Sequence, residues 1–151
     1  MTIFKNILVP VDFSDGSCAA LKLALELGKA FDAHIRVLHV WQPPEFAGAD
    51  LMVLAHSDGL SIGEYGQQKA AEAMEQLLDK CGASAAVDTS VTIGDPRYAI
   101  VDLADSLHAD LIVMGTQGRT GRARMFAGSV AEAVVRRAHV PVLTVHKPQP
   151  Q

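Results

Sequence analysis

Residues 111–132 read LIVMGTQGRTGRARMFAGSVAE, and this stretch is the strongest indication of the fold class. Its first four residues are an apolar run that predicts a buried strand. A glycine-rich loop follows, and Ser129 with Glu132 forms the Ser-x-x-Glu pattern of a capping box that opens a helix. A strand, a glycine-rich loop and a capped helix in this order are typical of α/β proteins.

The same loop predicts a binding site for an anion. The N-terminus of a helix presents unpaired backbone N–H groups and a partial positive charge, and both favour phosphate. We expect Gly115 to let a ligand approach the strand end, Gly118 to permit a turn with positive φ, and Gly128 to leave the backbone bare beside the helix cap. Arg119 adjoins Gly118 and is the arginine of this loop best placed for phosphate. The alternative is an ordinary surface connection with solvated arginines.

Outward from this stretch, strand-like and helix-like segments alternate along the chain. Apolar runs predict strands at 7–11, 34–40, 87–93, 111–114 and 140–145. Cap residues and helical spacing predict helices from a cap within 12–15 to about 28, and over 61–80, 96–107 and 129–138. In the helix over 61–80, the buried stripe is expected to hold Tyr65, Ala73, Leu77 and Cys81.

This alternation predicts an α/β fold in a single domain over 1–151. Its core would be a doubly wound, five-stranded, mainly parallel sheet with helices on both faces. Ligands of such sheets bind beyond the carboxyl ends of the strands, where the strand order reverses. Residues 42–61 show no sustained period and predict a long connection, and residues 147–151 predict a flexible tail.

Composition narrows the classes of function. The formal net charge is −4, so nucleic acid is not an expected partner. No apolar run is long enough to span a membrane, and the first residues lack the apolar core of a signal peptide, which favours a cytoplasmic location. Cys18 and Cys81 form no CxxC pair, and the six histidines show no ligand spacing. A disulfide framework and a zinc site are therefore not expected.

Several of these segments resemble those of a known protein family. The spacing Gly115-x2-Gly118-x9-Gly128-Ser129 resembles the nucleotide-binding signature of the universal stress protein family. The ILVPVD run at 7–12, the LHV run at 38–40 and the PVLTV run at 141–145 are also similar to that family. The resemblance extends from about residue 4 to residue 145.

The resemblance implies an ATP-binding domain of the adenine nucleotide alpha-hydrolase-like type with sheet order 3-2-1-4-5. It implies ATP as the ligand, with AMP or ADP as alternatives, with or without Mg²⁺ or Mn²⁺. It also implies a homodimer formed through the last strand, Val142–Val145. One departure stands out, because Ala131 replaces a hydroxyl residue found in some ATP-binding members and removes one hydrogen bond to phosphate.

The resemblance also implies roles for individual residues. One group would surround the nucleoside, with Val40 at the adenine and Asp12 near the ribose or a divalent metal. For Asp12, a second role as a helix cap is equally consistent with the sequence. The other group would hold the phosphates. The nucleoside group is Pro10, Val11, Asp12, Val40, Met114 and Gly115, and the phosphate group is Gly118, Arg119, Gly128, Ser129 and Val130.

Catalytic residues are not expected. The chain lacks a Gly-x-Ser-x-Gly elbow and a P-loop, and no residue stands out as a general base. We therefore expect an ATP-binding stress-response regulator or nucleotide sensor with little or no hydrolysis. The alternatives are a slow metal-dependent ATPase or nucleotidyl transferase, and a dimeric interaction module with a weak nucleotide pocket.

Overall fold

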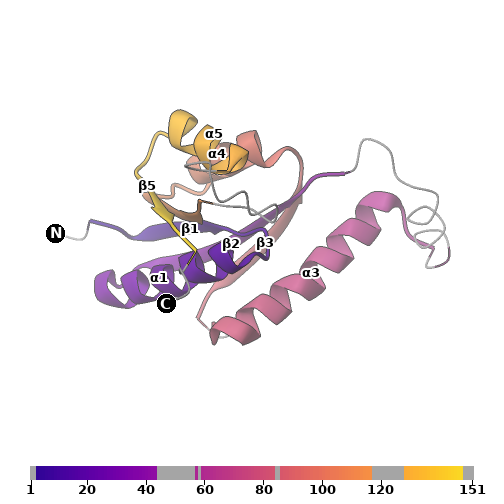
Figure 1. Cartoon of the computed structure of the whole chain (residues 1–151), viewed down its shortest axis with the longest axis horizontal. Helices are drawn as coiled ribbons and strands as arrows, with labels where there is room; N and C mark the ends of the chain where they lie inside the picture. The colour runs from indigo at the N-terminus through magenta and orange to yellow at the C-terminus, as the bar shows by residue number, and fades with distance from the viewer. Residues whose placement is uncertain (1–2, 44–56, 58, 84–85, 117–127, 148–151) are drawn as a thin grey trace.

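A computed structural model describes residues 3–43, 57, 59–83, 86–116 and 128–147 (Figure 1). Its five strands form one parallel sheet in the order β3-β2-β1-β4-β5. The predicted α/β class and strand order are therefore confirmed. The strands are β1 (Asn6–Pro10), β2 (His34–Trp41), β3 (Asp88–Ile93), β4 (Leu111–Gly115) and β5 (Val142–Val145), and the helices are α1 (Asp15–Phe31), α3 (Ile62–Cys81), α4 (Pro96–Ser106) and α5 (Ser129–Arg137).

Helices cover both faces of the sheet. In Figure 1, α4 and α5 lie above the sheet, and α1 and α3 lie below it. Successive side chains of a strand point to opposite faces, so Ile7 and Val9 of β1 join the core under α1 and α3 while Leu8 joins the core under α4 and α5. All three side chains are at most 1% exposed. This two-sided burial explains why the central strands are continuous apolar runs.

The central strands separate toward their carboxyl ends. β1 pairs with β2 along its whole length, from Asn6 to Pro10. Its pairing with β4 ends at Leu8 and Ile112, although β4 continues to Gly115. The order of the strands reverses at this place, because β1 leads outward to β2 on one side and β4 leads outward to β5 on the other. A crevice at such a point is where open α/β sheets bind ligands.

The helix starts agree with the sequence in three cases and correct it in one. Ser14 caps α1, and Asp95 with Pro96 opens α4. A capping box lies at the start of α3, where Ser61 and Glu64 bond each other's backbone N–H groups. The predicted box at Ser129 is wrong. Ser129 is the first helical residue of α5, one position too late to serve as its cap, and no side chain in the described part of the chain caps this helix.

The buried stripe of α3 is also rotated from the predicted one. The helix packs on the sheet through Gly66, Ala70, Met74, Leu77 and Leu78, whereas Tyr65, Ala73 and Cys81 are half-buried. The reason lies at Gly66, where an added Cβ would run into the indole ring of Trp41. Because Trp41 needs a position without a side chain opposite it, the helix turns its glycine toward the sheet.

The edge strands of the sheet, the predicted connection and the predicted tail were also anticipated from the sequence. The predicted strands at the two ends of the sheet, β3 and β5, are more exposed than the central strands β1 and β4. Most of the predicted connection at 42–61 and of the predicted tail at 147–151 lies outside the described residues. Within the described ranges, no helix is both long and apolar enough to cross a membrane.

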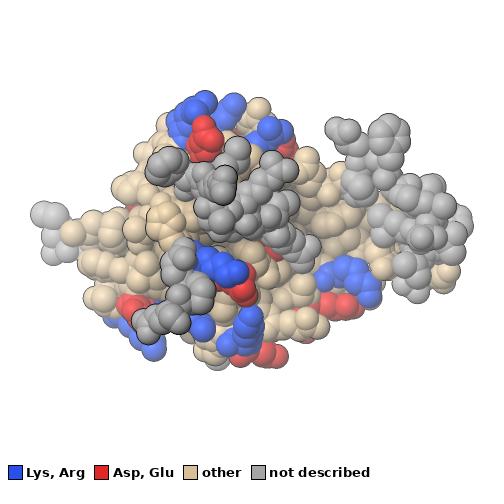
Figure 2. All heavy atoms as spheres, in the orientation of Figure 1, with Lys and Arg blue, Asp and Glu red and all other residues tan. Residues whose placement is uncertain are grey.

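Several charges on the helical surface are paired with one another. On the face drawn in Figure 2, Lys and Arg side chains lie beside Asp and Glu side chains. Over α4 and α5, Arg97 bonds Asp95 at 2.6 Å and Arg136 bonds Glu132 at 2.8 Å. The Arg97 guanidinium lowers the pKa of the Asp95 carboxyl below its usual value, chiefly through this hydrogen bond.

Candidate functional site

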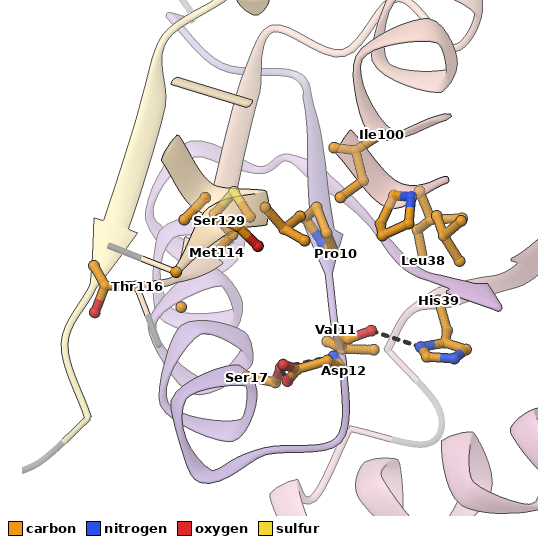
Figure 3. A pocket seen from close by; sticks show the side chains of 16 residues that line it. Pro10, Val11, Asp12, Ser17, Leu38, His39, Ile100, Met114, Thr116 and Ser129 are labelled. Carbon is orange, nitrogen blue, oxygen red and sulfur yellow. Dashed lines mark hydrogen bonds between the residues drawn. The ribbon is translucent and has the colours of Figure 1, made fainter. Parts of the chain in front are cut away.

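A pocket opens at the carboxyl ends of β1, β2 and β4, where the central strands separate. The starts of α1 and α5 and one side of α4 complete its wall (Figure 3). In the view of Figure 3, Asp12 and Ser17 lie together at one edge of the open space, and Ser129 and Met114 lie at another. The lining residues are Pro10, Val11, Asp12, Ser17, Leu38, His39, Val40, Pro96, Ile100, Met114, Gly115, Thr116, Gly128, Ser129, Val130 and Ala131.

The loop between β1 and α1 is held in a conformation that is rare for a large side chain. Phe13 has a φ of 66°, in the left-handed region that costs an L-residue about 1–2 kcal/mol. Its ring packs against the His39 ring with centroids 4.4 Å apart. His39 also holds the loop from β2, since its Nδ1 lies 2.8 Å from the carbonyl oxygen of Val11. A carbonyl only accepts, so Nδ1 carries the proton.

This turn brings Asp12 into a network of serine hydroxyl groups. The Asp12 backbone N–H donates to Ser17 Oγ at 2.8 Å, and Ser17 Oγ donates to Asp12 Oδ1 at 2.6 Å. The backbone N–H and hydroxyl of Ser14 donate to the same oxygen. Ser17 is only 4% exposed. Within the described part of the chain, the hydrogen bonds of the carboxylate therefore converge on Oδ1, and Oδ2 has no partner.

The cap role predicted for Asp12 is wrong, and its predicted role at a ligand stays a prediction. The cap of α1 is Ser14, whose hydroxyl accepts from the Ser17 backbone N–H. Asp12 supports that cap indirectly, because its Oδ1 accepts from the hydroxyl and the backbone N–H of Ser14. Its second oxygen stays available to a ligand in the pocket that Asp12 lines.

The start of α5 is fixed at the opposite wall by Thr116. The backbone N–H of Gly128 donates to the Thr116 carbonyl, and the Thr116 N–H donates to the Val145 carbonyl of β5 at 3.0 Å. Thr116 is 3% exposed. These bonds place the first turn of α5 at the strand ends. The backbone N–H groups of Ser129, Val130 and Ala131 precede the first intrahelical bond, which runs from the Glu132 N–H to the Gly128 carbonyl.

The structure gives a different reason for a glycine at position 115 from the one predicted. A Cβ at this position would lie 2.9 Å from the carbonyl carbon and 3.0 Å from the oxygen of Gly16. Both distances are too short for a real side chain, and both atoms belong to the backbone of α1. Gly115 therefore allows the first turn of α1 to pack on the end of β4. The expectation that its missing side chain serves ligand approach is corrected accordingly.

Every predicted site residue in the described part of the chain lines the pocket. Gly118 and Arg119 lie outside the described residues, as do Arg122 and Arg124. The pocket also has lining residues that sequence reasoning did not assign to a site, among them Ser17, Thr116, Pro96 and Ile100. Pro96 and Ile100 were predictable only as the start and the buried stripe of a helix. Their place in the pocket depends on how α4 packs over β2.

No metal centre is found among the described residues, where three or more His, Cys, Asp or Glu side chains nowhere converge. The pocket itself contributes one carboxylate, Asp12, and one imidazole, His39. The His39 Nδ1 is engaged with the Val11 carbonyl. The described wall thus offers hydrogen-bond donors and acceptors at its two polar edges and apolar side chains between them.

The chain is similar to known proteins over most of its length. The sequence model of the universal stress protein family matches residues 3–146. A universal stress protein of Methanocaldococcus jannaschii is 37% identical over 147 residues, which cover 97% of this chain and 85% of that protein. The structure of a universal stress protein from Lactobacillus plantarum has a TM-score of 0.76 at 27% identity, covering 94% of this chain and 97% of the other.

A further universal stress protein, solved in complex with cAMP, has a TM-score of 0.67 at 26% identity. The match covers 97% of this chain and 99% of that one. Similarity therefore extends over nearly the whole length of each of these proteins.

Proposed function

Because the chain belongs to the universal stress protein family, we propose that it binds an adenine nucleotide in the pocket at the carboxyl ends of β1 and β4. The nucleotide acts as a regulatory ligand, with little or no hydrolysis, in a stress-response regulator or nucleotide sensor. The relative solved with cAMP supports an adenine nucleotide as the class of ligand. The predicted cytoplasmic location stays a prediction.

The observation that carries this proposal is the uncapped start of α5 in the wall of the pocket. Among the described residues no side chain caps the helix, and Gly128 and Ser129 both line the cavity. Free N–H groups and the positive end of the helix dipole together stabilise a phosphate. Glu132 in the first turn would oppose an anion, but its carboxylate is paired with Arg136 one turn further along. Ser129 adds an exposed hydroxyl at the same place.

The base and the ribose have complementary surfaces in the same pocket. Val11, Leu38 and Val40 are buried apolar residues in the wall, and Ile100 approaches from α4. Such a surface suits the faces of a planar base, since pockets for small ligands combine apolar walls with a few polar groups. The unpaired Oδ2 of Asp12 is suited to accept from a ribose hydroxyl or to approach a divalent ion held by the phosphates.

ATP is the preferred ligand in this proposal, with AMP or ADP as alternatives. Gly118 and Arg119 are proposed to contact the phosphates beyond the described part of the chain, together with Gly128, Ser129 and Val130. Ala131 offers no hydroxyl to the phosphates, so we expect a smaller gain from each added phosphate than a hydroxyl residue there would provide.

We also propose a homodimer through β5. This strand is at the edge of the sheet and carries Leu143, which is 37% exposed. An unpaired strand edge presents N–H and C=O groups that can pair with another chain.

Titration calorimetry with adenosine, AMP, ADP and ATP tests the proposal, in wild type and in Ser129→Asp. An aspartate at the first position of a helix favours the helix but repels phosphate. We expect the variant to unfold like wild type and to retain adenosine binding, while the extra affinity for AMP over adenosine is lost. Val135→Asp makes the same charge change on an exposed site of α5 away from the pocket and should bind like wild type.

Two results would overturn the proposal. Absence of binding to wild type at millimolar nucleotide would favour the interaction module without a working pocket. Phosphate release above the buffer rate with Mg²⁺ or Mn²⁺, abolished in Asp12→Asn, would favour the slow ATPase.

A further inference from the structure

Two cysteines that are far apart in the sequence meet between α1 and α3. Cys18 lies in the first turns of α1 and Cys81 is the last residue of α3. Their Sγ atoms are 2.8 Å apart. Both helices cover the same face of the sheet and share one hydrophobic core. The two thiols are therefore brought together by the packing of two rigid helices, and both are unbonded in this structure.

The two thiols differ in their access to solvent. Cys18 is 6% exposed and belongs to the buried core, whereas Cys81 is half-buried at its margin. A reagent from solvent therefore reaches Cys81 first. The lysines near Cys81 are Lys80 on its own helix and Lys22 on α1, both of which favour its thiolate form. Lys80 is itself held near α1 by Asp15, at 3.8 Å.

We propose that Cys18 and Cys81 form a reversible thiol–disulfide modification site whose co-substrate is a small disulfide such as oxidised glutathione. The bond would join α1 to α3. An S–S bond is about 2.05 Å long, so formation of the bond shortens the 2.8 Å separation of the two sulfurs by only about 0.75 Å. Disulfides in cytosolic proteins are typically transient and redox-sensing. This inference does not depend on the nucleotide site.

The reaction balances in two exchange steps. The Cys81 thiol loses its proton to solvent, and its thiolate attacks one sulfur of oxidised glutathione. A Cys81–glutathione disulfide forms and one glutathione thiolate leaves. Cys18 then loses its proton and attacks Cys81 Sγ, which forms the Cys18–Cys81 bond and releases the second glutathione. Two protein thiols and one oxidised glutathione thus give one protein disulfide and two reduced glutathiones.

The first step sets the rate, because the net effect of the surroundings of Cys81 opposes formation of its thiolate. Burial, followed by the hydrogen bond to Cys18, raises the pKa of Cys81 to about 11, and the two lysines offset this only in part. The second step is fast by contrast, since the attacking sulfur is already in contact with its target. The mixed disulfide is therefore a short-lived intermediate.

The test exposes the wild-type protein to a series of ratios of oxidised to reduced glutathione. Free thiols are then alkylated under denaturing conditions, and the products are identified by mass spectrometry. We expect both cysteines to lose reactivity together as an intramolecular bond forms, and to regain it with reductant. The oxidised protein should have a Tm higher by roughly 5–15 °C, because the bond closes a long loop in the unfolded chain.

Two variants separate the roles of the cysteines. Cys18→Ser removes the resolving thiol, so the mixed disulfide of Cys81 with glutathione should accumulate. Cys81→Ser removes the accessible thiol, so Cys18 in the folded protein should stay unmodified. Both variants are checked for native circular dichroism before oxidation.

The proposal would be overturned by wild-type protein that keeps two alkylatable thiols at every glutathione ratio. A stable mixed disulfide on wild-type Cys81, without closure to Cys18, would overturn it equally. Rapid modification of Cys18 in folded Cys81→Ser would overturn the order of the steps.

Discussion

Gly115→Ala tests whether the glycine at the end of β4 serves the fold or the ligand. The added Cβ would lie 2.9 Å from the Gly16 carbonyl carbon, 3.0 Å from its oxygen and 3.3 Å from its Cα. All three atoms are backbone, so they can move only if the first turn of α1 moves. Ser17 belongs to that turn and holds Asp12, and the change therefore reaches the pocket through the helix.

The size of the effect follows from two opposing contributions. Overpacking of a close contact costs about 1–3 kcal/mol. Alanine in place of glycine recovers about 0.4–1 kcal/mol by restricting the unfolded chain. The net loss in the free energy of unfolding is about 1–2 kcal/mol, which lowers the Tm of a domain of this size by roughly 3–6 °C. The loss is expected without any nucleotide present.

Urea and thermal unfolding, followed by circular dichroism, measure this loss. Gly63→Ala is the matched control, because its Cβ would meet Ile93 Cδ1 at an ordinary 3.5 Å in the first turn of α3. The control should be as stable as wild type or more stable by up to about 1 kcal/mol. If Gly115→Ala unfolds like wild type and loses only nucleotide affinity, then the close approach of α1 is not the constraint and our reasoning is wrong.

Three further predictions concern the pocket edge, the cysteine pair and the sheet edge. Ser17→Ala should lower the free energy of unfolding by about 1–3 kcal/mol, because the Asp12 amide and carboxylate each lose a buried partner; equal urea midpoints would show that Ser14 suffices. With a Cys81 pKa of about 11, thiolate and hence the rate of oxidation by glutathione disulfide should rise about tenfold per pH unit from neutral pH toward that pKa; a flat profile would place the first attack elsewhere. Leu143→Glu should convert the proposed dimer to a folded monomer by light scattering, and a monomeric wild type would remove the β5 interface.

The architecture was predictable because its signals are local. Apolar runs such as 7–11 are buried on both faces, and alternation with helices leaves few topologies open. The starts of α1 and α4 were predictable from cap residues near the helix termini. The glycine spacing also pointed to the carboxyl ends of β1 and β4, where the structure places the pocket.

Errors arose where one residue had two local explanations. The Ser-x-x-Glu pattern at Ser129 resembles a capping box, but Thr116 bonds the Gly128 N–H and sets the helix start one residue earlier. The pattern at Ser61 is the one that caps a helix. Similarly, the buried stripe of α3 depends on Trp41, a residue of β2 that contacts Gly66. Local patterns do not say which partner a helix will meet.

The fold class and the loops that border the site were predictable from the sequence alone, and the strand order was implied by the family resemblance. The fold class and the site loops depend on short-range signals, since periodicity, caps and glycine spacing are properties of neighbouring residues. The sequence did not show that Gly115 serves the approach of α1, that Ser17 holds Asp12 at one oxygen, or that Cys18 meets Cys81. The Gly115 and cysteine contacts join elements that are distant along the chain, and only packing brings them within reach. The Ser17 contact spans five residues and depends on the turn at Phe13, where the ring packs against His39.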